Sequence, residues 1–170
     1  GAMAELVIGD PADPATDIGP AIDASAKRML EAYIDENRAH VVARAALPRG
    51  LAGGFVAPVA IEVKLSAAPT REIFGPVLHV VRWKADELDA VLASVAATGY
   101  GLTLGIHSRI DGFQRRIAAA LPVGNVYVNR STIGAVVGVQ PFGGQGLSGT
   151  GPKAGGPHYQ PRFAAEKTVS

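Results

Sequence analysis

The feature that most constrains this chain lies between Pro76 and Asn129, where runs of apolar residues typical of strands alternate with segments whose apolar residues have helical spacing. Three runs, PVLHVVRW, LTLGIHS and VGNVYVN, are typical of strands. Between them lie DELDAVLASVAAT and a stretch from about Ile110 to Ala120, whose apolar residues recur at helical spacing. Strands that alternate with helices of this length form right-handed βαβ units. The sequence therefore predicts an α/β fold with a parallel sheet covered on both faces.

The region before Pro76 predicts one helix and two extended segments. Apolar residues from Ala26 to Ile34 recur at i, i+3, i+4, i+7 and i+8, which indicates an amphipathic helix over about Asp23 to Arg38. Either Asp23 or Ser25 is placed to cap it. Val41 to Leu47 and Gly54 to Leu65 are rich in β-branched residues, so we predict that both are extended.

Composition excludes several classes of protein. With 170 residues and 48% apolar content, the chain suits one ordinary domain or a piece of a larger one. A formal charge of +1 without a block of like charges indicates neither a nucleic-acid nor a membrane-surface partner. The sequence has no apolar run long enough to cross a bilayer and no secretory leader, so we expect a soluble cytoplasmic protein.

Metal and cysteine chemistry are not expected. The chain has no cysteine, which removes disulfides, thiolate metal sites and a cysteine nucleophile. Its four histidines lack zinc spacing, and the aspartates of the opening GDPADPATDIGPAID lack the spacing of a calcium loop. We therefore predict no metal site within these 170 residues.

A glycine-rich stretch near the end of the chain admits two interpretations. Gly144, Gly146 and Gly149 spell the G-x-G-x-x-G of a dinucleotide-binding loop, which works only between a strand and a helix. Pro152 and the Gly-Gly-Pro that follows prevent a helix here. We favour a long glycine loop that allows close backbone approach, and a free-standing nucleotide binder is the weaker alternative.

Several motifs in one order resemble the NAD(P)-dependent aldehyde dehydrogenase superfamily. They are IGDPADPATDIGPAID, EIFGP within TREIFGP, GYGLT, VGNVYVN and PFGGQGLSGTG. The resemblance extends from about Met3 to Val169, and IGAVVGVQPFGG with GLSGTGPKAGGPHY narrows it to L-glutamate-γ-semialdehyde dehydrogenases, especially the dehydrogenase domain of the bifunctional proline utilization A family. Ser131 and Thr132 stand where that family usually has asparagine followed by methionine or glutamine, and Gln145 replaces an expected glutamate.

The resemblance implies roles for particular residues. Glu72 would accept hydrogen bonds from the nicotinamide ribose of NAD, and Phe74 would pack near the nicotinamide ring. The amides of Gly134 and Ala135, in the loop Ile133 to Gly138, would receive the substrate α-carboxylate. Phe142 would form an aromatic wall around the aliphatic part of the substrate. The alternatives are that Glu72 is a surface carboxylate, that Phe74 packs in the core, and that the loop Ile133 to Gly138 is a plain turn before a strand.

The resemblance also implies an incomplete catalytic set. The family needs a cysteine thiolate, a hydride transfer to NAD and hydrolysis of a thioester. Its nucleophile precedes the matched region, so the resemblance implies no catalytic residue within this chain. We expect residues 1–163 to be the later part of the catalytic domain, which needs the remainder of that domain, and 164–170 to be an oligomerisation strand of a homo-oligomer. FAD would belong only to a separate proline dehydrogenase domain. The alternative is a non-catalytic structural or oligomerisation module.

Overall fold

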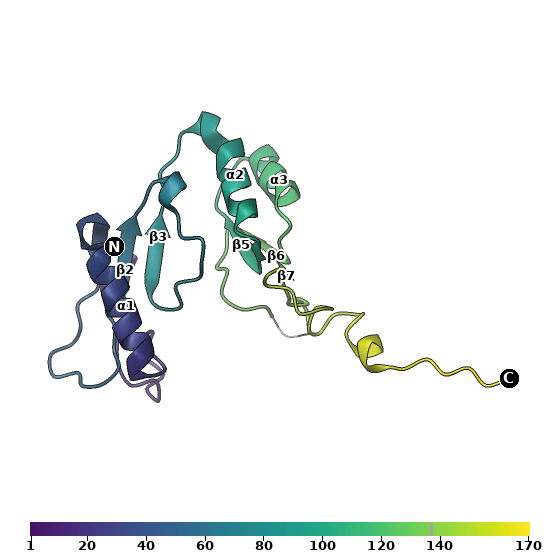
Figure 1. Cartoon of the computed structure of the whole chain (residues 1–170), viewed down its shortest axis with the longest axis horizontal. Helices are drawn as coiled ribbons and strands as arrows, with labels where there is room; N and C mark the ends of the chain where they lie inside the picture. The colour runs from purple at the N-terminus through teal and green to yellow at the C-terminus, as the bar shows by residue number, and fades with distance from the viewer. Residues whose placement is uncertain (137) are drawn as a thin grey trace. The chain divides into compact units, whose positions relative to one another are not determined.

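The computed structural model describes residues 1–136 and 138–170, and these form two compact units, Gly1–Lys84 and Ala85–Ser170 (Figure 1). Each unit has its own cluster of buried apolar side chains. The two units are therefore described separately. Within the described residues, no helix combines the length and the apolar character that crossing a membrane requires.

The first unit places one helix beside a small mixed sheet. Helix α1 spans Ala24–Glu36, and the strands are β1 (Val41–Arg44), β2 (Val59–Glu62) and β3 (Val77–Val80). The strand order is β1-β2-β3, with β1 antiparallel to β2 and β2 parallel to β3. Short 3-10 helices lie at Ala2–Glu5, Arg38–His40 and Leu65–Ala67.

The predicted helix and its cap are confirmed. Asp23 accepts a hydrogen bond from the Ala26 amide at 2.7 Å, so Asp23 rather than Ser25 is the N-cap. One face of the helix buries Leu30 and Ile34 in a cluster with side chains of β2 and the segment before it. Fully burying aliphatic side chains of this size contributes about 1.5–3 kcal/mol each, which holds α1 on the sheet.

The second unit contains a parallel strand pair joined by a helix. After a 3-10 turn at Ala85–Glu87 come α2 (Leu88–Ala97), β4 (Tyr100–Gly101), β5 (Thr103–Ile106), α3 (Asp111–Ala120), β6 (Asn125–Val128) and β7 (Gln145–Gly146). Strands β5 and β6 are parallel and β4 pairs antiparallel with β7. A last 3-10 turn spans Gln160–Phe163.

The two faces of the β5–β6 pair differ in what covers them. Leu104, Ile106 and Val126 belong to the cluster formed with the apolar sides of α2 and α3. On the other face, Gly105 pairs with Tyr127, and the methyl group of Thr132 lies 2.7 Å from where a Cβ on Gly105 would be. The loop that follows β6 therefore lies on the face away from the helices.

The α/β class is confirmed, but the predicted single sheet was wrong for the strand that begins at Pro76. That strand, β3, pairs with β2 in the first unit, whereas β5 and β6 pair with each other in the second. The first three residues of β2 are buried in succession, which is the pattern of a central strand with a neighbour on each side. Hydrophobic period identifies a strand but does not identify its partner.

The tail forms no strand with any described part of the chain. Residues 164–170 are exposed and follow the last 3-10 turn without regular structure. Pairing of Glu166 to Val169 with a partner therefore stays a prediction.

Candidate functional site

In the first unit, the loop from Arg71 to Pro76 presents two of the predicted residues to solvent. Ile73 packs against the core cluster, while its neighbours Glu72 and Phe74 are exposed. Phe74 is 76% exposed. A Cβ at Gly75 would overlap the side chain of Leu30, so glycine allows the loop to lie directly on α1.

This loop borders two hollows of the first unit. Glu72 and Phe74 line one of about 60 Å³, together with Met29 and Tyr33 of α1. Phe74 and Gly75 also line a groove of about 400 Å³ whose other wall includes the segment Ile18 to Ile22. The arrangement offers an exposed carboxylate, which can only accept hydrogen bonds, beside an exposed aromatic face. These groups fit a ribose and a flat ring.

A tyrosine–histidine pair lies beneath this loop and was not predicted. The Tyr33 hydroxyl and the Nε2 atom of His79 are 2.8 Å apart, and the two rings meet edge to face with centroids 5.8 Å apart. Burial lowers the pKa of His79. Burial also raises the pKa of Tyr33, while Arg71 acts to lower it and Glu36 to raise it. The pair joins α1 to β3 with a neutral hydrogen bond.

In the second unit, an asparagine joins the ends of the two parallel strands. Asn129 follows β6 with φ of 55°, a left-handed conformation that asparagine tolerates. Its Oδ1 accepts from the Ser108 amide at 2.9 Å, and its Nδ2 donates to the Ser108 carbonyl at 2.8 Å. The loop after β6 therefore starts from a defined point at the carboxyl end of the strand pair.

The predicted anchor loop contains a glycine in the left-handed conformation. Gly134 has φ of 63°, which glycine adopts without strain. Within residues 1–136 and 138–170, neither the Gly134 amide nor the Ala135 amide donates a hydrogen bond. Ser131 Oγ accepts from the Ile133 amide and Gln140 Oε1 accepts from the Val136 amide, both at 3.1 Å. Val137, inside the predicted loop, lies outside the described residues.

Phe142 is held by its backbone rather than by its ring. Its amide donates to the Ala154 carbonyl at 3.0 Å, and the Ala154 amide donates back at 2.9 Å. Asn125 of β6 bonds to the residues on either side of Phe142. Sequence reasoning missed Asn125; the available signal was a polar residue at the start of an otherwise apolar strand.

The glycine-rich stretch is a packed loop, which confirms the interpretation favoured from sequence. A Cβ at Gly144 would collide with Ser148, and one at Gly146 would collide with the carbonyl of Gly99. Strand β7 within this stretch pairs with β4, and residues 147–170 contain no α-helix. The helix N-terminus that a pyrophosphate loop needs is therefore missing from these residues.

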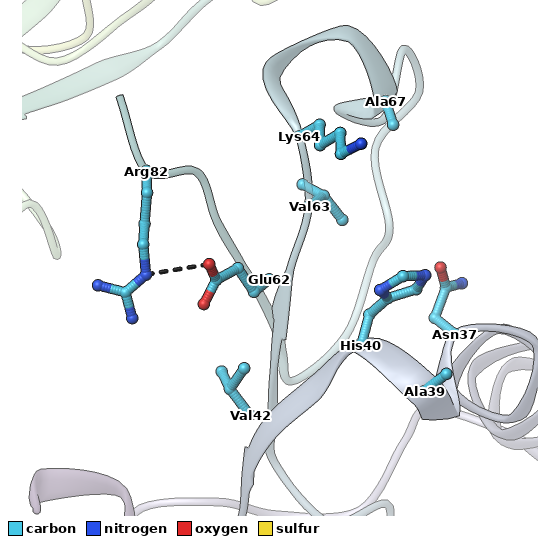
Figure 2. A pocket seen from close by; sticks show the side chains of 9 residues that line it. All are labelled: Asn37, Ala39, His40, Val42, Glu62, Val63, Lys64, Ala67 and Arg82. Atoms are coloured by element: carbon cyan, nitrogen blue, oxygen red, sulfur yellow. Dashed lines mark hydrogen bonds and ion pairs between the residues drawn. The ribbon is translucent and has the colours of Figure 1, made fainter. Parts of the chain in front are cut away.

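A further hollow of about 610 Å³ lies beside β1 and β2, away from every predicted residue. Figure 2 shows the Arg82–Glu62 ion pair on one side of it and His40 with Asn37 on the other. The pair is 3.0 Å long and exposed, so it contributes little to stability. Among the described residues, no group of acidic, histidine or cysteine side chains could hold a metal ion.

The chain belongs to the aldehyde dehydrogenase family, whose model matches residues 1–169. It is 49% identical to the bifunctional protein PutA of Salmonella typhimurium, covering 98% of this chain but 13% of that protein. A solved variant of proline utilization A from Bradyrhizobium japonicum matches at 54% identity and a TM-score of 0.90, covering 99% of this chain and 17% of that one. A 1-pyrroline-5-carboxylate dehydrogenase from Thermus, solved with bound NAD, matches at 37% identity and a TM-score of 0.78. The match covers 95% of this chain and 32% of that one.

The tyrosine–histidine pair predicts a pH dependence of stability. Because the pKa of His79 is lower in the folded chain, the unfolded chain binds more protons below the ordinary value of about 6.5. The contribution of neutral His79 to the free energy of unfolding is therefore complete above about pH 6.5, and it is lost as the pH falls through the lower pKa of the folded chain. We expect the urea concentration at the unfolding midpoint to decrease as the pH is lowered from about 7 to about 5. The decrease should be smaller in His79→Gln. His158→Gln, at an exposed position, should behave as the wild type. An equal fall in His79→Gln would contradict this assignment.

Proposed function

We propose that this chain is part of an NAD-dependent dehydrogenase that oxidises L-glutamate γ-semialdehyde, formed from Δ1-pyrroline-5-carboxylate, to L-glutamate in proline catabolism. Its contribution is the anchor for the substrate α-carboxylate and the contact with the nicotinamide ribose. The observation that carries the proposal is the pair of adjacent amides, at Gly134 and Ala135, without an acceptor among the described residues. Similarity to PutA and to a 1-pyrroline-5-carboxylate dehydrogenase supports the substrate class.

Backbone amides suit the recognition of a carboxylate. Two neighbouring N–H groups on a loop that turns through a left-handed glycine form a small concavity for an anion. The absence of a side chain at Gly134 lets the carboxylate approach the backbone. Phe142 then forms an apolar wall for the methylene groups between the carboxylate and the aldehyde. Recognition at one end of the substrate orients the other end.

The loop from Arg71 to Pro76 supplies the cofactor contact in this proposal. The Glu72 carboxylate accepts hydrogen bonds from the two ribose hydroxyls, and Phe74 packs beside the nicotinamide ring. NAD, when bound, supplies the acceptor for the hydride that leaves the aldehyde carbon. The overall reaction consumes one aldehyde, one NAD⁺ and one water, and it yields one carboxylate, one NADH and two protons.

The remaining groups of the reaction lie outside these 170 residues. The sequence contains no cysteine, so the nucleophile that aldehyde oxidation in this family needs comes from the remainder of the dehydrogenase domain. Residues 1–163 form part of that domain, and 164–170 form the strand through which a homo-oligomer assembles. We place the enzyme in the cytoplasm. FAD belongs to a separate proline dehydrogenase domain where the longer polypeptide is bifunctional.

The first test is oxidation of two aldehydes by the natural, full-length polypeptide that contains this chain. We expect NADH to form from L-glutamate γ-semialdehyde, and kcat/KM to fall about 100-fold with butanal, because two charge-assisted hydrogen bonds to the carboxylate are lost. Absorbance of NADH measures both rates. Equal use of the two aldehydes would contradict the anchor. No NADH from either would favour the non-catalytic module.

The second test is Glu72→Gln in the same polypeptide. The neutral amide is a weaker acceptor than the carboxylate, so KM for NAD should rise about tenfold while KM for the aldehyde stays unchanged. Glu5→Gln, which changes an exposed carboxylate in the 3-10 helix Ala2–Glu5, is the matched control. A KM for NAD that is the same in both variants would assign Glu72 to an ordinary surface role.

A further inference from the structure

Asn125 is a buried polar side chain that bonds on both sides of Phe142. It is 9% exposed. Its Nδ2 donates to the Pro141 carbonyl at 3.1 Å, and its Oδ1 accepts from the Gly143 amide at 3.3 Å. One side chain therefore fixes the peptide groups that precede and follow Phe142.

Lys153, which precedes the residue that pairs with Phe142, adds further hydrogen bonds to this set. Its ammonium donates to the Gly124 carbonyl and, at 3.3 Å, to Asn125 Oδ1. Its side chain also covers Gly143, where an added Cβ would lie 3.2 Å from Lys153 Cγ. The next residue, Ala154, makes the two backbone bonds to Phe142. A half-buried cation thus lies under the turn that carries the phenyl ring.

The contact between this turn and β6 leaves no spare room. A Cβ at Gly124 would overlap the carbonyl of Gly143, so the turn rests directly on the backbone at the start of β6. In such a close contact, each buried polar group needs its partner, because an unpaired one carries its full desolvation cost. Asn125 and Lys153 supply those partners and exclude other positions of the turn.

We propose that Asn125 and Lys153 are positioning residues that clamp residues 141–143 and thereby fix the Phe142 ring against the aldehyde substrate. Neither side chain contacts the substrate itself. The inference rests on the proposed role of Phe142 and extends it to the groups that set the ring's place. Its consequence is a loss of substrate affinity, with hydride transfer and NAD binding unchanged, when the clamp is loosened.

The test uses Lys153→Met in the natural full-length polypeptide, since it keeps the aliphatic stem and removes the donors. We expect KM for L-glutamate γ-semialdehyde to rise about tenfold, with kcat and KM for NAD unchanged. Amide hydrogen exchange across residues 139–146 should become faster. Lys153→Arg, which keeps a cationic donor, should restore part of the affinity. Lys167→Met, in the exposed tail, is the matched control.

Asn125→Leu removes the centre of the clamp and should have the same effects more strongly, provided that it folds; Lys153→Met carries the test where it does not. Faster exchange without a change in KM would overturn the proposal and leave a purely structural contact. No difference between Lys153→Met and Lys167→Met would overturn it as well. A wild type that forms no NADH from the aldehyde would instead refute the proposed function, and this is seen before any variant is compared.

Discussion

The hydrogen bonds of Asn125 and Asn129 are the constraint on which the loop after β6, and with it the proposed substrate anchor, depends. Asn125 at the start of the strand and Asn129 just after it each bond to the backbone of a neighbouring segment with both amide atoms. A two-stranded parallel pair has few ladder bonds with which to hold a long loop. Side-chain amides provide the missing bonds, because each carries a donor and an acceptor. The loop that follows β6 is therefore tied at its start through Asn129 and near Phe142 through Asn125.

Glycine makes these contacts possible at a few positions. At Gly124 and Gly144 a side chain would collide with backbone, and at Gly75 it would collide with the side chain of Leu30 on α1. The spacing that resembles a nucleotide-binding motif arises from this requirement for close approach. Gly134 differs from them, because no atom lies within 4 Å of an added Cβ there and its φ of 63° is the feature that favours glycine. Glycines required by close packing and glycines required by a left-handed backbone look alike in the sequence.

Hydrophobic period predicted the elements of this fold better than their partners. The helix from Asp23, the helices α2 and α3, and the strands β5 and β6 all lie within the predicted segments, because each buries one apolar face locally. Pairing of β3 with β2 depends on contacts between segments that period does not encode. Asn125 was missed for a similar reason, since its partners follow it by 16 and 18 residues. Family resemblance, rather than residue pattern, suggested Glu72 and Gly134.

The anchor for the α-carboxylate is the central claim, and a crystal structure of the full-length polypeptide with L-glutamate tests it most directly. The account predicts that one carboxylate of the glutamate accepts hydrogen bonds from the amides of Gly134 and Ala135, with nitrogen–oxygen distances of about 2.9 Å. Phe142 should lie against the methylene groups. Glutamate bound elsewhere, or bound with both amides still free, would contradict the account.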